Sequence, residues 1–185
     1  MAPKMESKIF LITKIEEKGL GCVAQKEIKR GALILREKPC LLQEVGLGSG
    51  SYVNDYFADI FKAFEKMNND QKKTFFELAN CYEQQIEETN DKMQDFINYL
   101  KENPKPSYQK GDALKIIQIT ETNRFHNGVC LEMSRFNHSC IPNAEYFWNE
   151  DTDARDVRAI KYGFDFCIDY KNKYALQPHC YFRTL

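Results

Sequence analysis

Residues 135–144 read Arg-Phe-Asn-His-Ser-Cys-Ile-Pro-Asn-Ala, and this stretch decides how the whole chain is interpreted. It combines two asparagines, a histidine, a cysteine and a proline within ten residues, so the complete pattern is rare by chance. One simple interpretation is a polar turn before a strand. Another is a pair of metal ligands, His138 and Cys140.

The spacing of the metal-binding residue types argues against a zinc site. Structural zinc usually takes ligands in pairs such as C-x₂₋₄-C with H-x₃₋₅-H. Cys130 and Cys140 are ten residues apart, and His126 and His138 are twelve apart. Neither spacing matches, so we expect no bound metal, and the polar turn stays open as an alternative.

The composition is that of an ordinary globular domain. Of 185 residues, 43% are hydrophobic and 29% are charged. This length predicts a single domain over residues 1–185, with room for an inserted subdomain. A net charge of −1 provides no broad basic field, so we expect no direct nucleic-acid binding.

Cysteine usage and the lack of long apolar segments indicate a reducing compartment. The seven cysteines are an odd number and have no paired spacing. The first ten residues contain no signal-peptide core, and no segment approaches the roughly 18 apolar residues of a membrane span. We expect an intracellular protein, nuclear and/or cytoplasmic, with mostly free thiols and no membrane association.

The chain begins and ends with strand patterns. Residues 8–15, 22–28 and 32–42 read as strands, the third broken at Pro39, and they are separated by turns at residues 18–21 and 29–31. After residue 143, the strand patterns are 144–148, 156–160 and 164–170, with a polar turn at 149–153.

A helical block separates these two sets of strands. Residues 46–51 are rich in glycine and serine and predict a flexible linker. Three apolar sets at helical spacing follow: Phe57, Ile60, Phe61, Phe64 and Met67; Phe75, Phe76, Ala79, Tyr82 and Ile86; Met93, Phe96, Ile97 and Leu100. Asp70 and Asn90 are the expected N-caps of the second and third helices, and residues 103–106 end the third. This order predicts an α+β fold with an antiparallel β core and a helical insertion at about 50–115.

The segment Asn-His-Ser-Cys-x-Pro-Asn resembles the signature of SET-domain protein lysine methyltransferases. Residues 18–24, 28–31 and 34–39 are similar to the opening of that domain, which ends in Glu-x-Pro. Residues 122–125 resemble an Asn-x-Phe segment that follows a helical insertion in SMYD-type and fungal-type members. Residues 158–161 and 167–170 resemble the final strands. The resemblance implies a β-clip-like core in which the 135–144 segment takes part in a knot-like crossing.

The resemblance also implies a cofactor, S-adenosylmethionine, and the residues that bind it. The expected cofactor-binding residues are Lys18, Gly19, Leu20, Gly21, Asn123, Phe136, Asn137 and His138. The glycine turn would approach through its backbone, since no Cβ blocks it. Asn137 would hydrogen-bond the cofactor's amino group, the His138 backbone would meet the adenine, and Lys18 would neutralise the carboxylate.

Tyr170 is the catalytic residue that the resemblance implies. The reaction moves a methyl group from a sulfonium to a neutral lysine amine by in-line displacement. Such a transfer needs alignment and exclusion of water, which a tyrosine hydroxyl and backbone carbonyls can provide. The partner would be a protein with a target lysine, histone or non-histone.

Three features depart from the family pattern. No cysteine-rich MYND zinc finger follows residue 41, which favours a fungal or protist type. Residues 161–165 form a shorter turn than is usual before the last strand. The sequence to Leu185 contains no post-SET Cys-x-Cys-x-x-Cys, so we expect that zinc segment to be absent or incomplete and the form truncated. A non-catalytic SET module that binds a partner or the cofactor, or an inactive truncated product, is therefore the alternative function.

Overall fold

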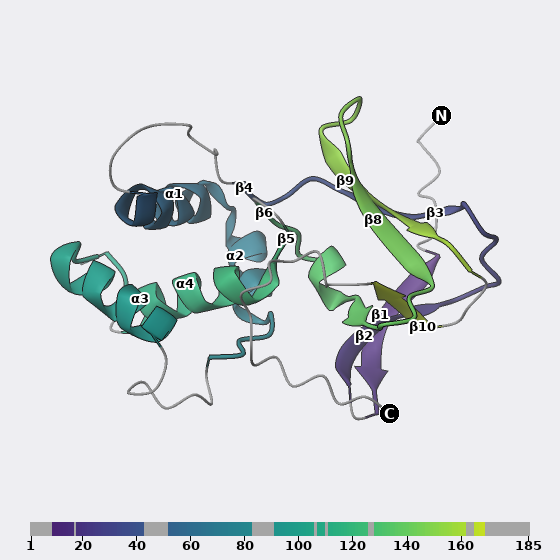
Figure 1. Cartoon of the computed structure of the whole chain (residues 1–185), viewed down its shortest axis with the longest axis horizontal. Helices are drawn as coiled ribbons and strands as arrows, with labels where there is room; N and C mark the ends of the chain where they lie inside the picture. Colours follow the sequence, from purple (N-terminus) through teal and green to yellow (C-terminus); the bar gives the residue numbers. More distant parts are fainter. Residues whose placement is uncertain are drawn as a thin grey trace. The chain divides into compact units, whose positions relative to one another are not determined.

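The computed structural model describes residues 9–16, 18–42, 52–82, 91–105, 107–109, 111–125, 128–161 and 165–168 (Figure 1). Contacts within the chain divide it into two compact units. The first unit comes from residues 1–38 and 132–172, and the second comes from residues 39–131 and 173–185. The 135–144 segment thus belongs with the N-terminal strands.

The first unit contains a four-stranded sheet built from both ends of the sequence. Strands β1 (Phe10–Ile15) and β2 (Gly19–Ala24) form an antiparallel hairpin. Strand β10 (Asp165–Ile168) pairs antiparallel with β2 on one side and parallel with β7 (Asn137–His138) on the other. The order is β1-β2-β10-β7. The parallel pair is an exception to the predicted antiparallel core.

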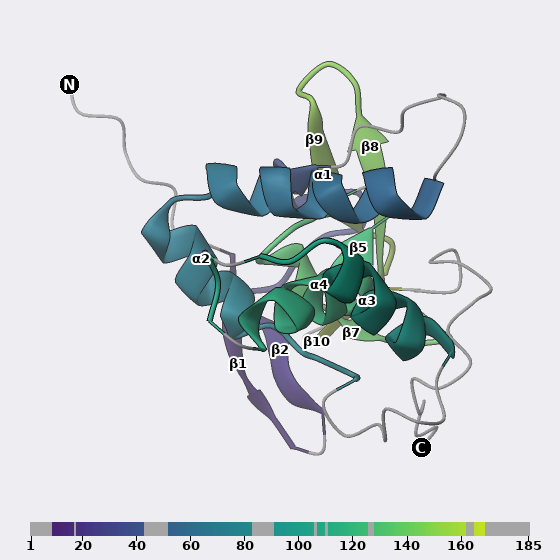
Figure 2. The ribbon, with the colours of Figure 1, turned by 90° about the vertical axis from the view of Figure 1, so that its left-hand side faces the viewer.

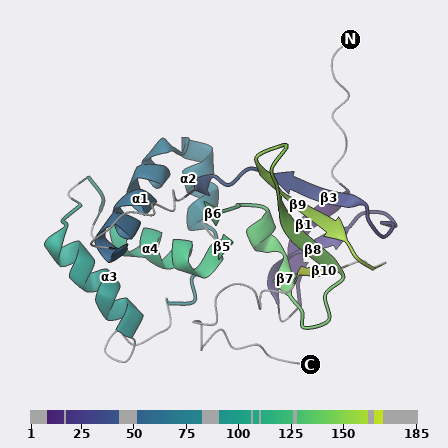
Figure 3. The same cartoon turned by 45° about the horizontal axis from the view of Figure 1, so that its top comes forward.

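The other sheet of the first unit is entirely antiparallel. It has the order β3-β9-β8, with β3 at Leu33–Glu37, β8 at Ala144–Asn149 and β9 at Ala154–Ala159 (Figure 3). A short 3-10 helix, η2 (Met133–Arg135), precedes β7. The buried core of this unit includes Phe10, Cys22, Ile28, Ile34, Met133, Phe136, Ala144, Ala154, Val157 and Ala159.

The second unit is mainly helical. It contains α1 (Tyr52–Lys66), α2 (Asn69–Phe76), α3 (Asp91–Glu102) and α4 (Asp112–Asn123). Helix α4 contacts each of the other three helices, and Figure 2 shows α1 and α3 beside it. A small sheet of order β4-β6-β5 completes the unit, with β4 at Leu41–Leu42, β5 at Arg124–Phe125 and β6 at Gly128–Val129.

The predicted apolar face of α1 is confirmed. Its five members, Phe57, Ile60, Phe61, Phe64 and Met67, are all buried. Aromatic rings from three helices meet there, with ring centroids of Phe57 and Phe96 5.6 Å apart and those of Phe64 and Phe75 5.3 Å apart, both edge to face. Such pairs add stability beyond the burial of their area.

The predicted start and end of the second helix were wrong. Asn68, rather than Asp70, is the N-cap of α2, because its side chain accepts from the Gln71 amide while the Gln71 side chain accepts from the Asn68 amide. This capping box places Asp70 in the first turn. The helix ends at Phe76, so Ala79 and Tyr82 follow it. Ile86 and Asn90 lie outside the described residues.

Helix α4 was missed because its sequence lacks a polar face. Six consecutive residues, Ile116 to Glu121, are buried. A helix buried all round shows no 3.6-residue pattern, and its isoleucines and threonines are typical of strands. The predicted β-strand at 22–28 also begins and ends too late, since β2 spans Gly19–Ala24 and so includes Gly19 and Gly21. Strand β9 similarly begins at Ala154, not at 156.

Several of the remaining fold predictions are not tested by the described residues. The linker at 46–51 lies outside them. The knot-like crossing of the 135–144 segment, the single-domain boundary and the insertion at about 50–115 stay predictions. Strand β10 lies within the predicted 164–170. No helix in the described ranges is both long and apolar enough to span a bilayer.

Candidate cofactor site

Gly21 and Asn137, two predicted cofactor-binding residues, lie against each other in the first unit. Gly21 pairs with Thr13 in the β1–β2 hairpin, and Asn137 lies in β7. A Cβ at Gly21 would collide with Nδ2 of Asn137 and with Cδ1 of Ile15. Glycine therefore leaves the space that the Asn137 amide occupies.

The Asn137 amide nitrogen is buried without a partner. Among the residues that the structure describes, nothing accepts a hydrogen bond from Nδ2 of Asn137. A buried polar group in this state costs about 1–3 kcal/mol. Native proteins rarely leave such groups unpaired, and a ligand group is one explanation. The arrangement thus indicates a place where a polar ligand can bind.

The pairing of β7 and β10 determines where the segment after β10 begins. Asn137 pairs with Cys167, and His138 pairs with Ile168. Tyr170, the predicted catalytic residue, follows Ile168 by two positions and lies outside the described residues. Its role stays a prediction.

His138 and Cys140 form a local pair. The His138 Nε2 atom lies 3.3 Å from Sγ of Cys140, and the Ile141 amide donates to the Ser139 hydroxyl at 3.1 Å. Within the described part of the chain, no three His, Cys, Asp or Glu side chains are grouped to hold a metal. Cys22, Cys40, Cys81, Cys130 and Cys140 form no disulfide within the described residues.

Phe136 is a core residue of the first unit. Its side chain is 1% exposed, and its ring lies 5.7 Å from that of Phe10, centroid to centroid. This packing attaches the start of β7 to β1. A contact between Phe136 and a cofactor would therefore have to come from its backbone.

The other predicted residues of the hairpin are on the surface. Lys18 and Leu20 are exposed, and Gly19 has a φ of 74°, which favours glycine. The Lys18 amide donates to the Ile15 carbonyl at 3.1 Å and closes the turn. Backbone approach at Gly19 is therefore sterically open, because nothing lies within 4 Å of a Cβ built there.

Asn123 belongs to the second unit and is fixed there. Its amide nitrogen donates to the carbonyls of Ala79 at 2.7 Å and Ile119 at 2.8 Å. These bonds hold the segment after α2 against the end of α4. The structure shows this packing role, while contact with a cofactor stays a prediction.

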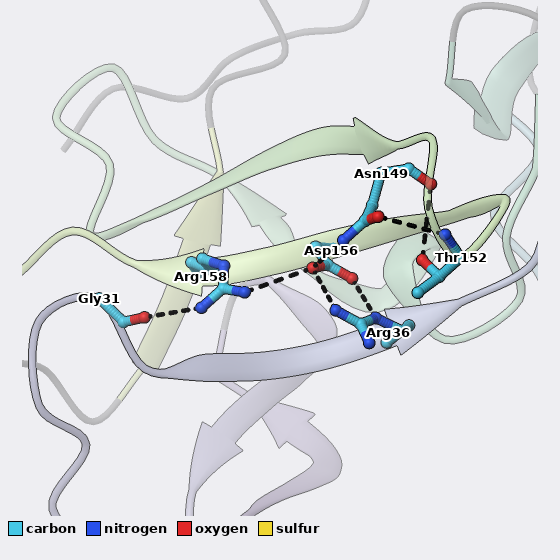
Figure 4. Close-up of polar contacts among 6 residues, drawn as sticks. All are labelled: Gly31, Arg36, Asn149, Thr152, Asp156 and Arg158. Carbon is cyan, nitrogen blue, oxygen red and sulfur yellow. Dashed lines mark hydrogen bonds and ion pairs between the residues drawn. The ribbon is translucent and has the colours of Figure 1, made fainter.

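A buried carboxylate joins the strands of the second sheet (Figure 4). Asp156 on β9 is 0% exposed and accepts from Nε and Nη2 of Arg36 at 2.6 and 2.7 Å and from Nδ2 of Asn149 at 3.1 Å. Arg158 completes the network at 3.5 Å. The Arg36 hydrogen bond, helped by Asn149, lowers the pKa of Asp156 although burial opposes the shift. This network anchors the end of β3.

Glu37 and Ile15 are site residues that sequence reasoning missed. Ile15 packs beside Gly21, and the Glu37 carboxylate accepts from the backbone amide of Met133 at 2.9 Å. Glu37 is the glutamate of the Glu-x-Pro segment, which was the available signal, but its partner is 96 positions away. No local pattern identifies such a contact.

A model of the SET domain family matches residues 19–171. This span includes β2, the glycine turn and the whole 135–144 segment. The chain belongs to the SET domain family. The predicted family is thus confirmed on most of the chain.

Two curated relatives resemble this SET domain protein over 84% of its length. A putative SET domain-containing protein of Acanthamoeba polyphaga mimivirus is 26% identical over 171 residues. Histone-lysine N-methyltransferase set5 of Schizosaccharomyces pombe is 25% identical over 156 residues. The chain spans 64% and 39% of these two relatives.

Solved structures share the SET domain fold. A structure of Rubisco LSMT bound to AdoMet matches with a TM-score of 0.57 and 17% identity, over 89% of this chain and 48% of that one. The SET domain of LSMT bound to lysine and AdoHcy matches with a TM-score of 0.55 and 14% identity, over 89% and 49%. These matches confirm the predicted α+β fold class.

Proposed function

We propose that this chain is an S-adenosylmethionine-dependent protein-lysine N-methyltransferase. The observation that carries the proposal is the buried, unpartnered Asn137 amide beside Gly21. Membership of the SET domain family supports it, and so does a relative named a histone-lysine N-methyltransferase. One solved neighbour holds both lysine and AdoHcy.

The residues of the first unit fit this cofactor. S-adenosylmethionine carries an ammonium, a carboxylate and an adenine, and a side-chain amide can turn to present either its oxygen or its nitrogen. Asn137 can thus meet the ammonium with its oxygen or the carboxylate with its nitrogen. Gly19 and Gly21 would offer backbone groups at close range, and the His138 backbone would face the adenine. When bound, the cofactor supplies an electrophilic methyl group.

The protein's task would be to align the lysine amine and exclude water. The amine must be neutral and in line with the bond that breaks. Tyr170, two residues after β10, is the group proposed to orient the amine through its hydroxyl. Backbone carbonyls near it would share that role. No acid–base pair is required for this step.

The finer identity is also a proposal. The absence of a cysteine-rich finger in the sequence after residue 41 favours a fungal-type or SMYD-like member without a MYND finger. The substrate would be a protein, histone or non-histone, that presents a lysine. The location would be reducing, in the nucleus and/or the cytoplasm, and cysteines such as Cys22 and Cys130, which form no disulfide within the described residues, fit this.

The test is transfer of labelled methyl from S-adenosylmethionine to mixed cell proteins or a peptide library. Tyr170→Phe should lower kcat and kcat/KM together while leaving the Kd of the cofactor unchanged. Tyr108→Phe is the control, because the Tyr108 hydroxyl donates to Glu65 within the second unit. A Tyr170→Phe variant with the parent's turnover would place the catalytic group elsewhere, and a folded parent that binds no cofactor would refute the proposed function.

A further inference from the structure

The carboxylate of Glu37 is held at the start of η2. Glu37 is the last residue of β3. Its Oε1 accepts from the Glu132 amide at 3.1 Å, and its Oε2 accepts from the Glu132 and Met133 amides at 3.2 and 2.9 Å. The first amides of a helix have no partner within the helix. A negative charge at that end stabilises them.

This contact continues into the cofactor segment through a single residue, Met133. Met133 donates its amide hydrogen to Glu37, and its carbonyl accepts from the Phe136 amide at 3.1 Å. Phe136 directly precedes Asn137 and is packed on Phe10. The position of Asn137 beside Gly21 therefore depends on where Glu37 holds η2.

Strand β3 is itself firmly fixed. Arg36, the neighbour of Glu37, binds the buried Asp156 carboxylate with two hydrogen bonds (Figure 4). Glu37 also pairs with Arg155 of β9 in the sheet register. The carboxylate of Glu37 thus projects from a firmly paired strand onto the short helix η2.

We propose that Glu37 is a positioning residue for the cofactor site, acting through η2 to set where β7 presents the Asn137 amide. The identity of the ligand rests on the proposed function, but the effect of Glu37 on the positions of η2 and β7 does not depend on any ligand. Glu37 contacts backbone amides and touches no reacting atom. Removing the Glu37 carboxylate should therefore weaken ligand binding more than a substitution elsewhere that destabilises the fold by the same amount.

Three full-length variants separate positioning from stability. Glu37→Met keeps the length of the side chain and removes both acceptor atoms. Glu37→Gln keeps one acceptor but loses the charge, so it should show a smaller effect in the same direction. Ile34→Val is the control, because it removes one buried carbon from the same strand and changes no hydrogen-bonding group.

Amide hydrogen exchange without cofactor tests the structural part. Glu37→Met should speed exchange at Met133 and Phe136 by about tenfold or more relative to Ile34→Val, since hydrogen bonds to charged groups are strong. Unchanged protection at Phe136 in folded Glu37→Met would overturn the proposal. If Glu37→Met does not fold, Glu37→Gln must show the same two amides more exposed than in Ile34→Val, or the proposal fails.

Calorimetry with S-adenosylhomocysteine tests the functional part. Glu37→Met should weaken binding by about tenfold, and Ile34→Val should leave it within about twofold. Equal weakening in both would show a general effect of stability and would overturn the positioning role. Faster exchange at Phe136 in Glu37→Met, together with a parent that binds no S-adenosylhomocysteine, would support the structural role of Glu37 and refute the proposed function instead.

Discussion

The Gly21→Ala substitution should weaken ligand binding more than it destabilises the fold. The new methyl group would occupy the space now filled by Nδ2 of Asn137 and Cδ1 of Ile15. Both atoms end flexible side chains, so rotation can relieve the clash without moving the strand. An off-rotamer side chain costs about 0.5–1.5 kcal/mol, and overpacking costs about 1–3 kcal/mol. We expect the free energy of unfolding to fall by about 1–2 kcal/mol.

The effect of Gly21→Ala on ligand binding should be larger than its effect on folding. A displaced Asn137 amide would lose the hydrogen bond proposed for it with a charged ligand group, a bond worth about 1.5–3 kcal/mol. That loss corresponds to about a 10- to 150-fold weaker Kd. The side chain of Asn137 remains present, so any loss reports its position.

Gly31→Ala is the matched control. Gly31 has a φ of 82° and lies in the turn before β3, and a Cβ built there meets nothing within 4 Å. Its cost is backbone strain of about 1–2 kcal/mol. Urea denaturation should find similar stability losses in both variants, and calorimetry with S-adenosylhomocysteine should find weaker binding only in Gly21→Ala. Equal affinities in the two variants would refute the reasoning.

Two further predictions concern polar groups in the cores of the units. Because the pKa of Asp156 is lowered in the folded protein, its carboxylate stabilises the fold above the unfolded pKa of about 3.9, and this contribution is lost as the pH falls through the folded pKa. Urea denaturation from pH 6 to 3 should therefore show that the free energy of unfolding depends less on acid in Asp156→Asn than in the parent. An unchanged dependence would contradict the assignment. The Thr120 hydroxyl is buried and has no partner among the described residues, so Thr120→Val should raise the free energy of unfolding by about 1 kcal/mol. Thr122→Val should lower it instead, because that hydroxyl donates to the Gln118 carbonyl at 2.8 Å, and a loss of stability in Thr120→Val would count against an unpaired group.

The spacing of apolar residues predicts helices that have one buried face, but not a helix that is buried on every side. Helix α1 has one apolar face, so its spacing identified both the helix and its buried residues. Helix α4 has buried residues on every side and therefore has no such spacing. This helix lies at the centre of the helical unit, so its sequence lacks the apolar spacing that identifies a surface helix. That central position is set by tertiary packing.

The candidate site could be predicted only in part for the same reason. Resemblance to a family located Gly21 and Asn137, and the structure places them in contact. The partners that fix this contact, Ile15 and Glu37, lie far from Asn137 in the sequence. Hydrogen bonds such as those that Glu37 accepts from the Glu132 and Met133 amides follow from chain topology, which residue patterns do not encode.

The register of β10 is set by two partner strands. Its four residues pair with two different strands: Asp165 and Phe166 pair with β2, and Cys167 and Ile168 pair with β7. A shift by one residue would break both ladders at once and would turn each side chain to the opposite face. The two partners therefore constrain each other's alignment through β10. Since Tyr170 comes two residues after Ile168 in the sequence, the same double pairing fixes the end of the strand that leads to the proposed catalytic residue.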